Sequence, residues 1–358
     1  MNNHLINVYF RVDANRQIGT GHLVRCQIMA EKMKKIGMKC TFLLYKTPTF
    51  YELQLKDKGF EVIYMSMLVA KYAERMVHLI HNQSLYPHNL LVIDSDEEAY
   101  YTAEFQEKIR ANGIKLMMIA FKHREPFFSD IVHNQNILAL EYQYKTAPYT
   151  KCLLGTGYVI LKEVYKTMNL TAQNKDYHNL KILLINFGGA DRSNQTYKAL
   201  KGVYESGIYF ERIVIVVGIL YLPVEELRVL IREYDQNNTS LHINTDRMPQ
   251  FQLMADLAIT SGGLTAWELA CLGTPNFVIP TSYREMESAL LMHKKDLVYY
   301  IGQADMIKEE EIAQQLNSIV EDFPHRQQMA RRFHDMVAPN GCDKVIQEVS
   351  KLFYAKSD

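Results

Sequence analysis

A histidine that follows two glycines near the amino terminus is the first feature of this sequence that could do chemistry. The segment RVDANRQIGTGHLVRC places Gly19 and Gly21 on either side of Thr20, directly before His22. Glycines let a backbone turn sharply, and a helix beginning at about His22 would offer unpaired N–H groups and a partial positive charge. Such a helix end favours the neutral imidazole, which can accept a proton. We therefore predict that His22 is a general base, with a hydrogen-bonded helix-start residue as the alternative.

Three residues near this loop help to define what it could bind. A dinucleotide fingerprint would require glycine at position 24, where this chain has Val24. Asp13, just after the first apolar run, could orient the imidazole, hydrogen-bond a ligand or cap a turn. Arg25, one turn into the helix, could contact a ligand or lie in solvent.

Two glycine-rich turns in the second half of the chain could hold a phosphate. Each follows an apolar run and precedes a helix-length segment, so its backbone N–H groups would face an anion. Two such turns in one domain are more specific than one. Glu268, about one turn into the second of these helices, could accept hydrogen bonds from two ribose hydroxyls or compensate the helix dipole. The turn residues are Gly188 and Gly189 in the first, and Ser261, Gly262, Gly263 and Thr265 in the second.

The elements that position these motifs alternate regularly along the chain. Short apolar runs separated by amphipathic, helix-length segments predict parallel βαβ units. We predict an α/β fold with two Rossmann-like parallel-sheet domains and an interdomain cleft. The expected strands are Ile6–Phe10, Thr41–Tyr45, Leu90–Ile93, Lys115–Ala120, Ile182–Phe187, Ile213–Val217, Leu257–Thr260 and Asn276–Ile279. The expected divisions are a first domain over 1–166, a linker over 167–179, a second domain over 180–330 and a helical segment over 331–358.

Composition excludes several classes of function. The chain has 40 Lys and Arg against 40 Asp and Glu, so no net positive field favours nucleic acid or an anionic membrane. The five cysteines are scattered and form no CxxC pair, which argues against a disulfide framework and a zinc site. Neither a signal peptide nor a membrane span is expected. We expect a soluble cytoplasmic protein, and the sequence does not determine its oligomeric state.

At these motifs the chain resembles a known family. The strand–D–x(5)–GxGH–x(2)–R unit, with FGG-x-D and SGGLTAWELACLGTP, resembles the nucleotide-sugar hydrolases of pseudaminic acid biosynthesis and the related SpsG-like spore-coat polysaccharide proteins. The second half is similar to MurG-type GT-B glycosyltransferases. The likeness runs over nearly the whole chain. It implies a GT-B fold and an enzyme that acts on a UDP-linked sugar without a metal or another cofactor.

The resemblance also implies roles for individual residues. His22 would activate water for attack at the anomeric carbon, and the product in the pseudaminic pathway would be a free diacetamido-trideoxy-hexose plus UDP. The diphosphate would lie at the Ser261–Thr265 turn, the ribose at Glu268 and the uracil against backbone near Met248. Sugar contacts would come from the first half, at Asp13, Gly19, Gly21, Arg25, Asp94, Ser95 and Asp96.

Two departures from the family pattern fall where the sugar would be touched. The hydrolases read Asp-His-Tyr where this chain reads Asp94-Ser95-Asp96, and they read Asn-Gln where it has Arg284-Glu285. We therefore predict a hydrolase and keep two alternatives open. One is a GT-B glycosyltransferase that uses a UDP-sugar donor, and the other is a nucleotide-sugar binding protein without catalysis.

Overall fold

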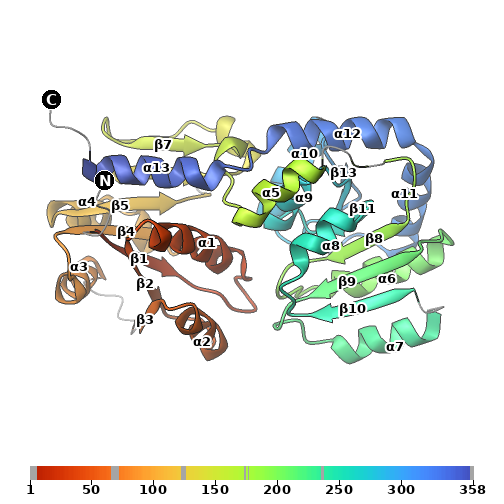
Figure 1. Ribbon diagram of the computed structural model, residues 1–358, viewed down its shortest axis with the longest axis horizontal. Helices are drawn as coiled ribbons and strands as arrows, with labels where there is room; N and C mark the ends of the chain where they lie inside the picture. Colours follow the sequence, from red (N-terminus) through yellow and green to blue (C-terminus); the bar gives the residue numbers. More distant parts are fainter. Residues whose placement is uncertain are drawn as a thin grey trace. The chain divides into compact units, whose positions relative to one another are not determined.

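The computed structural model of the chain describes residues 6–65, 72–121, 126–172, 175, 177–234 and 238–354. They form two compact α/β units, each with its own parallel sheet (Figure 1). The first unit contains 6–18, 22–160 and 340–354, and the second contains 19–21 and 161–339. The expected fold class, two Rossmann-like parallel-sheet domains, is confirmed.

The first sheet has seven strands in the order β3-β2-β1-β4-β5-β6-β7. All the pairings that join them are parallel. The order reverses between β1 and β4, and in such sheets ligands bind where the order reverses, beyond the carboxyl ends of the strands. The strands are β1 Ile6–Val12, β2 Lys39–Leu44, β3 Glu61–Tyr64, β4 His88–Asp94, β5 Ile114–Ile119, β6 Ile131–Asn134 and β7 Lys151–Leu154.

Helices cover both faces of this sheet (Figure 1). Helix α1 buries Leu23, Cys26 and Met33, which lie on one side of the helix, and it ends before Gly37, whose φ is +90°. The helices on this face are α1 Gly21–Lys35, α2 Thr49–Asp57 and α13 Gly341–Tyr354, and those on the other are α3 Tyr72–Gln83 and α4 Ala103–Ala111. Short 3₁₀ turns lie at Glu98–Tyr101, Ile137–Leu140 and Thr156–Tyr158.

The last helix, α13, belongs to the first unit although it lies at the far end of the chain. Val345 and Val349 are buried in the core with α1, and Lys32 on α1 pairs with Asp343. The helix begins at Gly341, where only glycine fits. A Cβ at this position would lie 2.4 Å from the Val159 carbonyl oxygen. The first unit is therefore completed by a segment more than 170 residues beyond its last strand.

The second sheet has six parallel strands in the order β10-β9-β8-β11-β12-β13, with its reversal between β8 and β11. Its strands are β8 Ile182–Asn186, β9 Arg212–Val217, β10 Thr239–Ile243, β11 Leu257–Thr260, β12 Asn276–Val278 and β13 Tyr299–Tyr300. Its helices are α5 Glu163–Ala172, α6 Gln195–Ser206, α7 Val224–Tyr234, α8 Met248–Met254, α9 Leu264–Cys271, α10 Tyr283–Lys294, α11 Glu309–Glu321 and α12 Phe323–Met336. Among the described residues, no helix is both long and apolar enough to cross a bilayer.

The segment expected to be a linker, 167–179, begins as part of a packed helix. Helix α5 continues to Ala172, and its Asn169 donates to the Cys271 carbonyl oxygen at 2.7 Å. Tyr165 on the same helix is buried and donates to Gln252 of α8. Positions 173, 174 and 176 lie outside the described residues. Within the expected linker, the buried residues of this helix are Asn169 and Ala172, a polar and a small side chain, so no apolar stripe marks the helix there.

Candidate functional site

His22 lies on the first turn of α1, which follows β1 at the reversal point of the first sheet. Its Nδ1 is 2.5 Å from Oδ1 of Asp94, the last residue of the adjacent strand β4. A carboxylate only accepts hydrogen bonds, so Nδ1 carries the proton and the lone pair is on Nε2. The imidazole side chain is 20% exposed, and within the described part of the chain no group bonds to Nε2. This pair leaves one ring nitrogen free to accept a proton.

Asp94 is held in its ionised form by Arg25 and His22. Burial opposes ionisation of this fully buried carboxyl, but Arg25 and His22 outweigh it and hold its pKa well below the usual range. Arg25 binds in a bidentate manner, with Nε 2.5 Å from Oδ2 and Nη2 on Oδ1. Its Nη2 also lies 3.2 Å from the His22 Nδ1. The resemblance predicted that Arg25 and Asp94 contact the sugar. In the structure, both side chains lie against His22.

Asp13 does not orient the imidazole. Its Oδ1 accepts hydrogen bonds from the backbone of Tyr45 and Lys46 at 2.7 and 2.8 Å and from Thr47 Oγ1 at 2.9 Å. Its Oδ2 pairs with the buried Arg11 at 2.7 Å. The Asp13 carboxylate therefore fixes the loop after β2 to the end of β1. This contact corresponds to the third possibility considered for Asp13, that it caps a turn.

The other residues predicted for this region surround the same strand ends. Gly19 has a φ of +83°, which explains the glycine, and Gly21 begins α1. Ser95 is tied into its own loop, since its Oγ accepts from the Glu97 amide at 3.3 Å. Asp96 is exposed, and its charge helps raise the pKa of Arg25, though less than Asp94 does, while burial opposes the rise.

The two glycine turns of the second unit follow β8 and β11, the neighbouring strands at its reversal point. Gly188 and Gly262 have φ values of +77° and +90°, which other residues rarely adopt. Thr265 Oγ1 donates to Oδ1 of Asn186 at 3.2 Å, and this bond links the second turn to the first. The structure therefore brings together two motifs that lie more than 70 residues apart.

The helices that follow these turns differ at their first residues. At the start of α6, the side chain of Asp191, which precedes the helix, accepts hydrogen bonds from the backbone N–H groups of Gln195 and Thr196, each at 2.8 Å. Those amides are therefore already satisfied, and the turn at Gly189 does not present them to a ligand. The N-cap of α9 is Gly263, which has no side chain to do the same. The start of α9 is the better anion site of the two.

Glu268 on α9 is buried in a polar network. Gln252 Nε2 donates to its Oε2 at 2.8 Å, and Tyr165 donates to Oε1 of Gln252. Burial raises the pKa of Glu268, against the opposing effects of Gln252, Lys162 and Tyr165. The sequence assigned no role to Gln252 or Tyr165, because only the folded chain brings these side chains to Glu268.

Met248 is the first residue of α8, so its amide belongs to the unpaired first turn of that helix. This placement is compatible with the backbone contact expected from the resemblance. Across the described ranges, no group of three or more His, Cys, Asp or Glu residues has an arrangement that could hold a metal ion.

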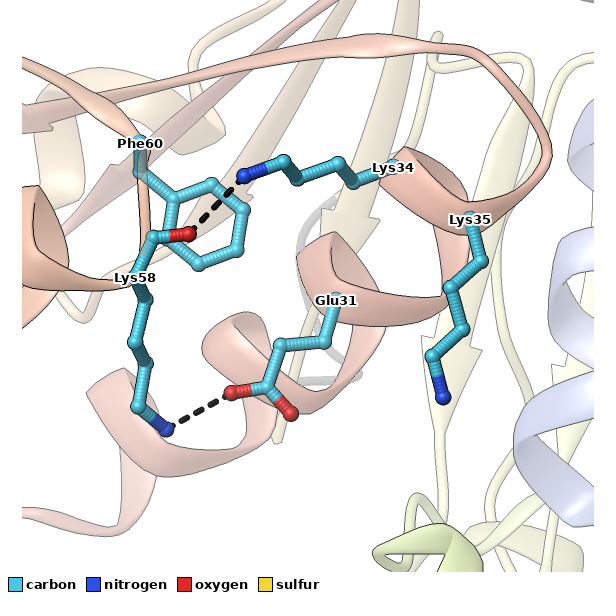
Figure 2. A pocket seen from close by; sticks show the side chains of 5 residues that line it. All are labelled: Glu31, Lys34, Lys35, Lys58 and Phe60. Atoms are coloured by element: carbon cyan, nitrogen blue, oxygen red, sulfur yellow. Dashed lines mark hydrogen bonds and ion pairs between the residues drawn. The ribbon is translucent and has the colours of Figure 1, made fainter.

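A pocket of about 490 Å³ lies at the opposite end of α1 from His22 (Figure 2). Lys34 donates to the Lys58 carbonyl oxygen at 2.9 Å, and Lys58 pairs with Glu31 at 2.7 Å. These contacts tie Glu31, Lys34 and Lys58 to one another along its wall. It has no connection with the predicted motifs, and we assign it no ligand.

Comparison with known proteins gives relatives at low identity. No family model matches the chain. It is 22% identical to the Bacillus subtilis spore coat polysaccharide biosynthesis protein SpsG over 347 residues, which covers 95% of this chain and 97% of that protein. It is 27% identical over 278 residues to the uncharacterized protein MJ1062 of Methanocaldococcus jannaschii, covering 75% of this chain but only 54% of that protein.

Similar solved structures cover both units. MurG of Acinetobacter baumannii has a TM-score of 0.65 at 16% identity, with 96% of this chain and 99% of that chain covered. The UDP-GlcNAc 2-epimerase of Neisseria meningitidis bound to UDP-GlcNAc has a TM-score of 0.58 at 12% identity, with 97% and 99% covered. The two parallel-sheet domains of this chain therefore have the fold of the GT-B glycosyltransferases and related epimerases.

Proposed function

We propose that this protein is an enzyme that cleaves the bond between the anomeric carbon and the diphosphate of a UDP-sugar in surface polysaccharide biosynthesis. The observation that carries the proposal is the His22–Asp94 pair, which leaves Nε2 of a partly exposed imidazole free at the reversal point of a sheet. The likeness to SpsG and to structures described as UDP-sugar enzymes supports the substrate class.

The first unit supplies the base in this proposal. An oxygen nucleophile, either water or a sugar hydroxyl, loses its proton to Nε2 of His22 as it attacks the anomeric carbon. Asp94 fixes the ring orientation and stabilises the imidazolium that forms, as the carboxylate does in catalytic triads. Arg25 keeps Asp94 ionised.

The second unit holds the nucleotide. The diphosphate binds at Ser261, Gly262, Gly263 and Thr265, where backbone amides and the start of α9 stabilise the charge of the leaving group. Glu268 accepts the ribose hydroxyls, and the uracil contacts backbone at Met248. The turn at Gly188 and Gly189 supports the site through the Asn186–Thr265 bond.

Glycosyl transfer is the reaction that the comparisons favour over the hydrolysis expected from the sequence. Glycosyltransferases are prominent among the solved structures that resemble both units. Hydrolysis remains the second candidate, because the GxGH–x(2)–R motif around His22 resembles that of the hydrolases. The two reactions share a donor site and differ in whether water or a hydroxyl group of an acceptor sugar attacks the anomeric carbon.

Incubation with a panel of UDP-sugars, with and without sugar acceptors, tests the proposal. We expect release of UDP from at least one donor, and we expect it to persist in excess EDTA because amides and a helix end meet the phosphate charge. Dependence on an acceptor indicates transfer, and free sugar without one indicates hydrolysis. Binding of UDP without turnover of any donor would contradict the enzyme assignment and leave a binding protein.

Replacing Glu268 by Gln should weaken UDP binding in calorimetry. Hydrogen bonds to a charged group contribute about 1.5–3 kcal/mol, so the loss should be roughly tenfold or more. Glu310→Gln, on an exposed position of α11, is the matched control and should bind UDP as the wild type does. Equal affinity of all three proteins would show that the ribose is held elsewhere.

A further inference from the structure

The carboxyl group of Glu285 lies against the turn assigned to the diphosphate. Its Oε1 accepts a hydrogen bond from Ser261 Oγ at 2.9 Å. A Cβ placed on Gly263 would be only 2.9 Å from the same oxygen, so Glu285 is in contact with the N-cap of α9. This residue stands where the resembling hydrolases carry an uncharged amide, and the proposed function gives it no role.

The hydrogen bonds of Glu285 come from loop residues. Its Oε2 accepts from the amide and the hydroxyl of Thr281, at 2.9 and 2.8 Å. Asp191 at the other turn binds the first-turn amides of α6 directly. Glu285 therefore lies beside the start of α9 but, unlike Asp191, does not bind the first-turn amides of the neighbouring helix. A diphosphate bound to the start of α9 would be its immediate neighbour.

A carboxylate and a diphosphate that lie side by side repel each other, and protonation of the carboxyl group removes that repulsion. The groups that face the carboxyl are Ser261 from the turn before α9, and Thr281 and Ser282 from the loop before α10; none of these is ionisable. Along α10 itself, the nearest charged residues in sequence are Arg284 and Glu287. Burial raises the pKa of Glu285, although the hydrogen bonds from Thr281, Ser261 and Ser282 oppose the rise.

We propose that Glu285 binds the diphosphate as a neutral carboxylic acid that donates a hydrogen bond to a phosphate oxygen, so that nucleotide binding takes up a proton. This inference rests on the proposed function, because it requires a diphosphate at the Ser261–Gly263 turn. It adds a residue that contacts the leaving group, and it makes nucleotide affinity fall as the pH rises. A neutral amide at this position would bind UDP without proton uptake.

Calorimetry of UDP binding tests the proposal. Wild-type protein, Glu285→Gln and the control Glu287→Gln are titrated in EDTA from about pH 6 to about pH 9, in buffers of different ionisation enthalpy. Above the pKa of Glu285, the affinity of the wild type should fall by about tenfold per pH unit relative to Glu285→Gln, with uptake of up to one proton. Titration of UDP itself is common to all three proteins and cancels in the comparison. Glu287→Gln should follow the wild type.

Identical proton uptake by wild type and Glu285→Gln would overturn the inference. So would a requirement for Mg²⁺, since a cation would then neutralise an ionised Glu285. Failure of every protein to bind UDP at any pH would instead overturn the proposed function together with the inference. If Glu285→Gln does not fold, Ser261→Ala provides a second test: loss of a donor to the carboxylate should move the fall in affinity to higher pH.

Discussion

The His22→Asn variant should lose about 10²–10⁴-fold in kcat while its affinity for UDP stays within a factor of about two. Asparagine keeps a polar side chain of similar size but cannot accept a proton, so the barrier should rise by about 3–5 kcal/mol. The residues assigned to the nucleotide belong to the second unit, so UDP affinity should not follow kcat. Steady-state kinetics and calorimetry of UDP binding measure the two quantities.

A matched control makes this prediction specific to His22. His78→Asn changes an exposed histidine on α3 and should retain wild-type kcat. If His22→Asn keeps more than about a tenth of the wild-type kcat, the base is another residue, and Asp96 is the next to replace.

The Asp94→Asn variant should lose both activity and stability. The amide cannot hold Nδ1–H of His22 as a carboxylate does, and we expect a loss of about 10²-fold or more in kcat. Breaking a buried ion pair costs about 3–5 kcal/mol in the free energy of unfolding; we expect the lower end because Arg25 is 21% exposed. Denaturant unfolding gives the stability, and Asp57→Asn, on an exposed position of α2, is the matched control.

A double-mutant cycle separates positioning from simple destabilisation. If Asp94 acts through His22, Asp94→Asn should have little further effect on kcat in the His22→Asn background, while the loss of stability should remain. Additive effects on kcat would show that Asp94 acts independently of the base.

The lowered pKa of Asp94 also predicts how its contribution to stability depends on pH. This contribution is fully present above the pKa of the residue in the unfolded chain, about 3.9, and is lost as the pH falls through the pKa in the folded protein. The difference in unfolding free energy between wild type and variant should therefore be constant near neutral pH and shrink only below about pH 4.

The strands that the sequence predicted correctly all lie inside the two sheets, away from their edges. β1, β4, β8 and β11 are buried on both faces, so their residues form continuous apolar runs. The strands β3, β7, β10 and β13 were missed because they lie at the sheet edges, where part of each strand is exposed and no such run exists. The interior strand β6 was missed because it is only four residues long and two of them, His133 and Asn134, are polar. Fold class therefore followed from local patterns, whereas the full extent of the sheets did not.

The sequence by itself determined which segments bear chemistry: the Gly19–His22 loop and the two glycine turns, because glycine spacing and helix starts are local properties of the chain. Only the tertiary structure decided how these segments are used. It pairs His22 with Asp94 across 72 residues, and it reserves Asp13 for a loop and Asp191 for a helix end. It also sets Glu285 beside Ser261. The local sequence around an aspartate or glutamate does not indicate which of these roles it has. The role depends on which hydrogen-bond donors the order of the parallel strands brings to the carboxylate, and no local pattern specifies those donors.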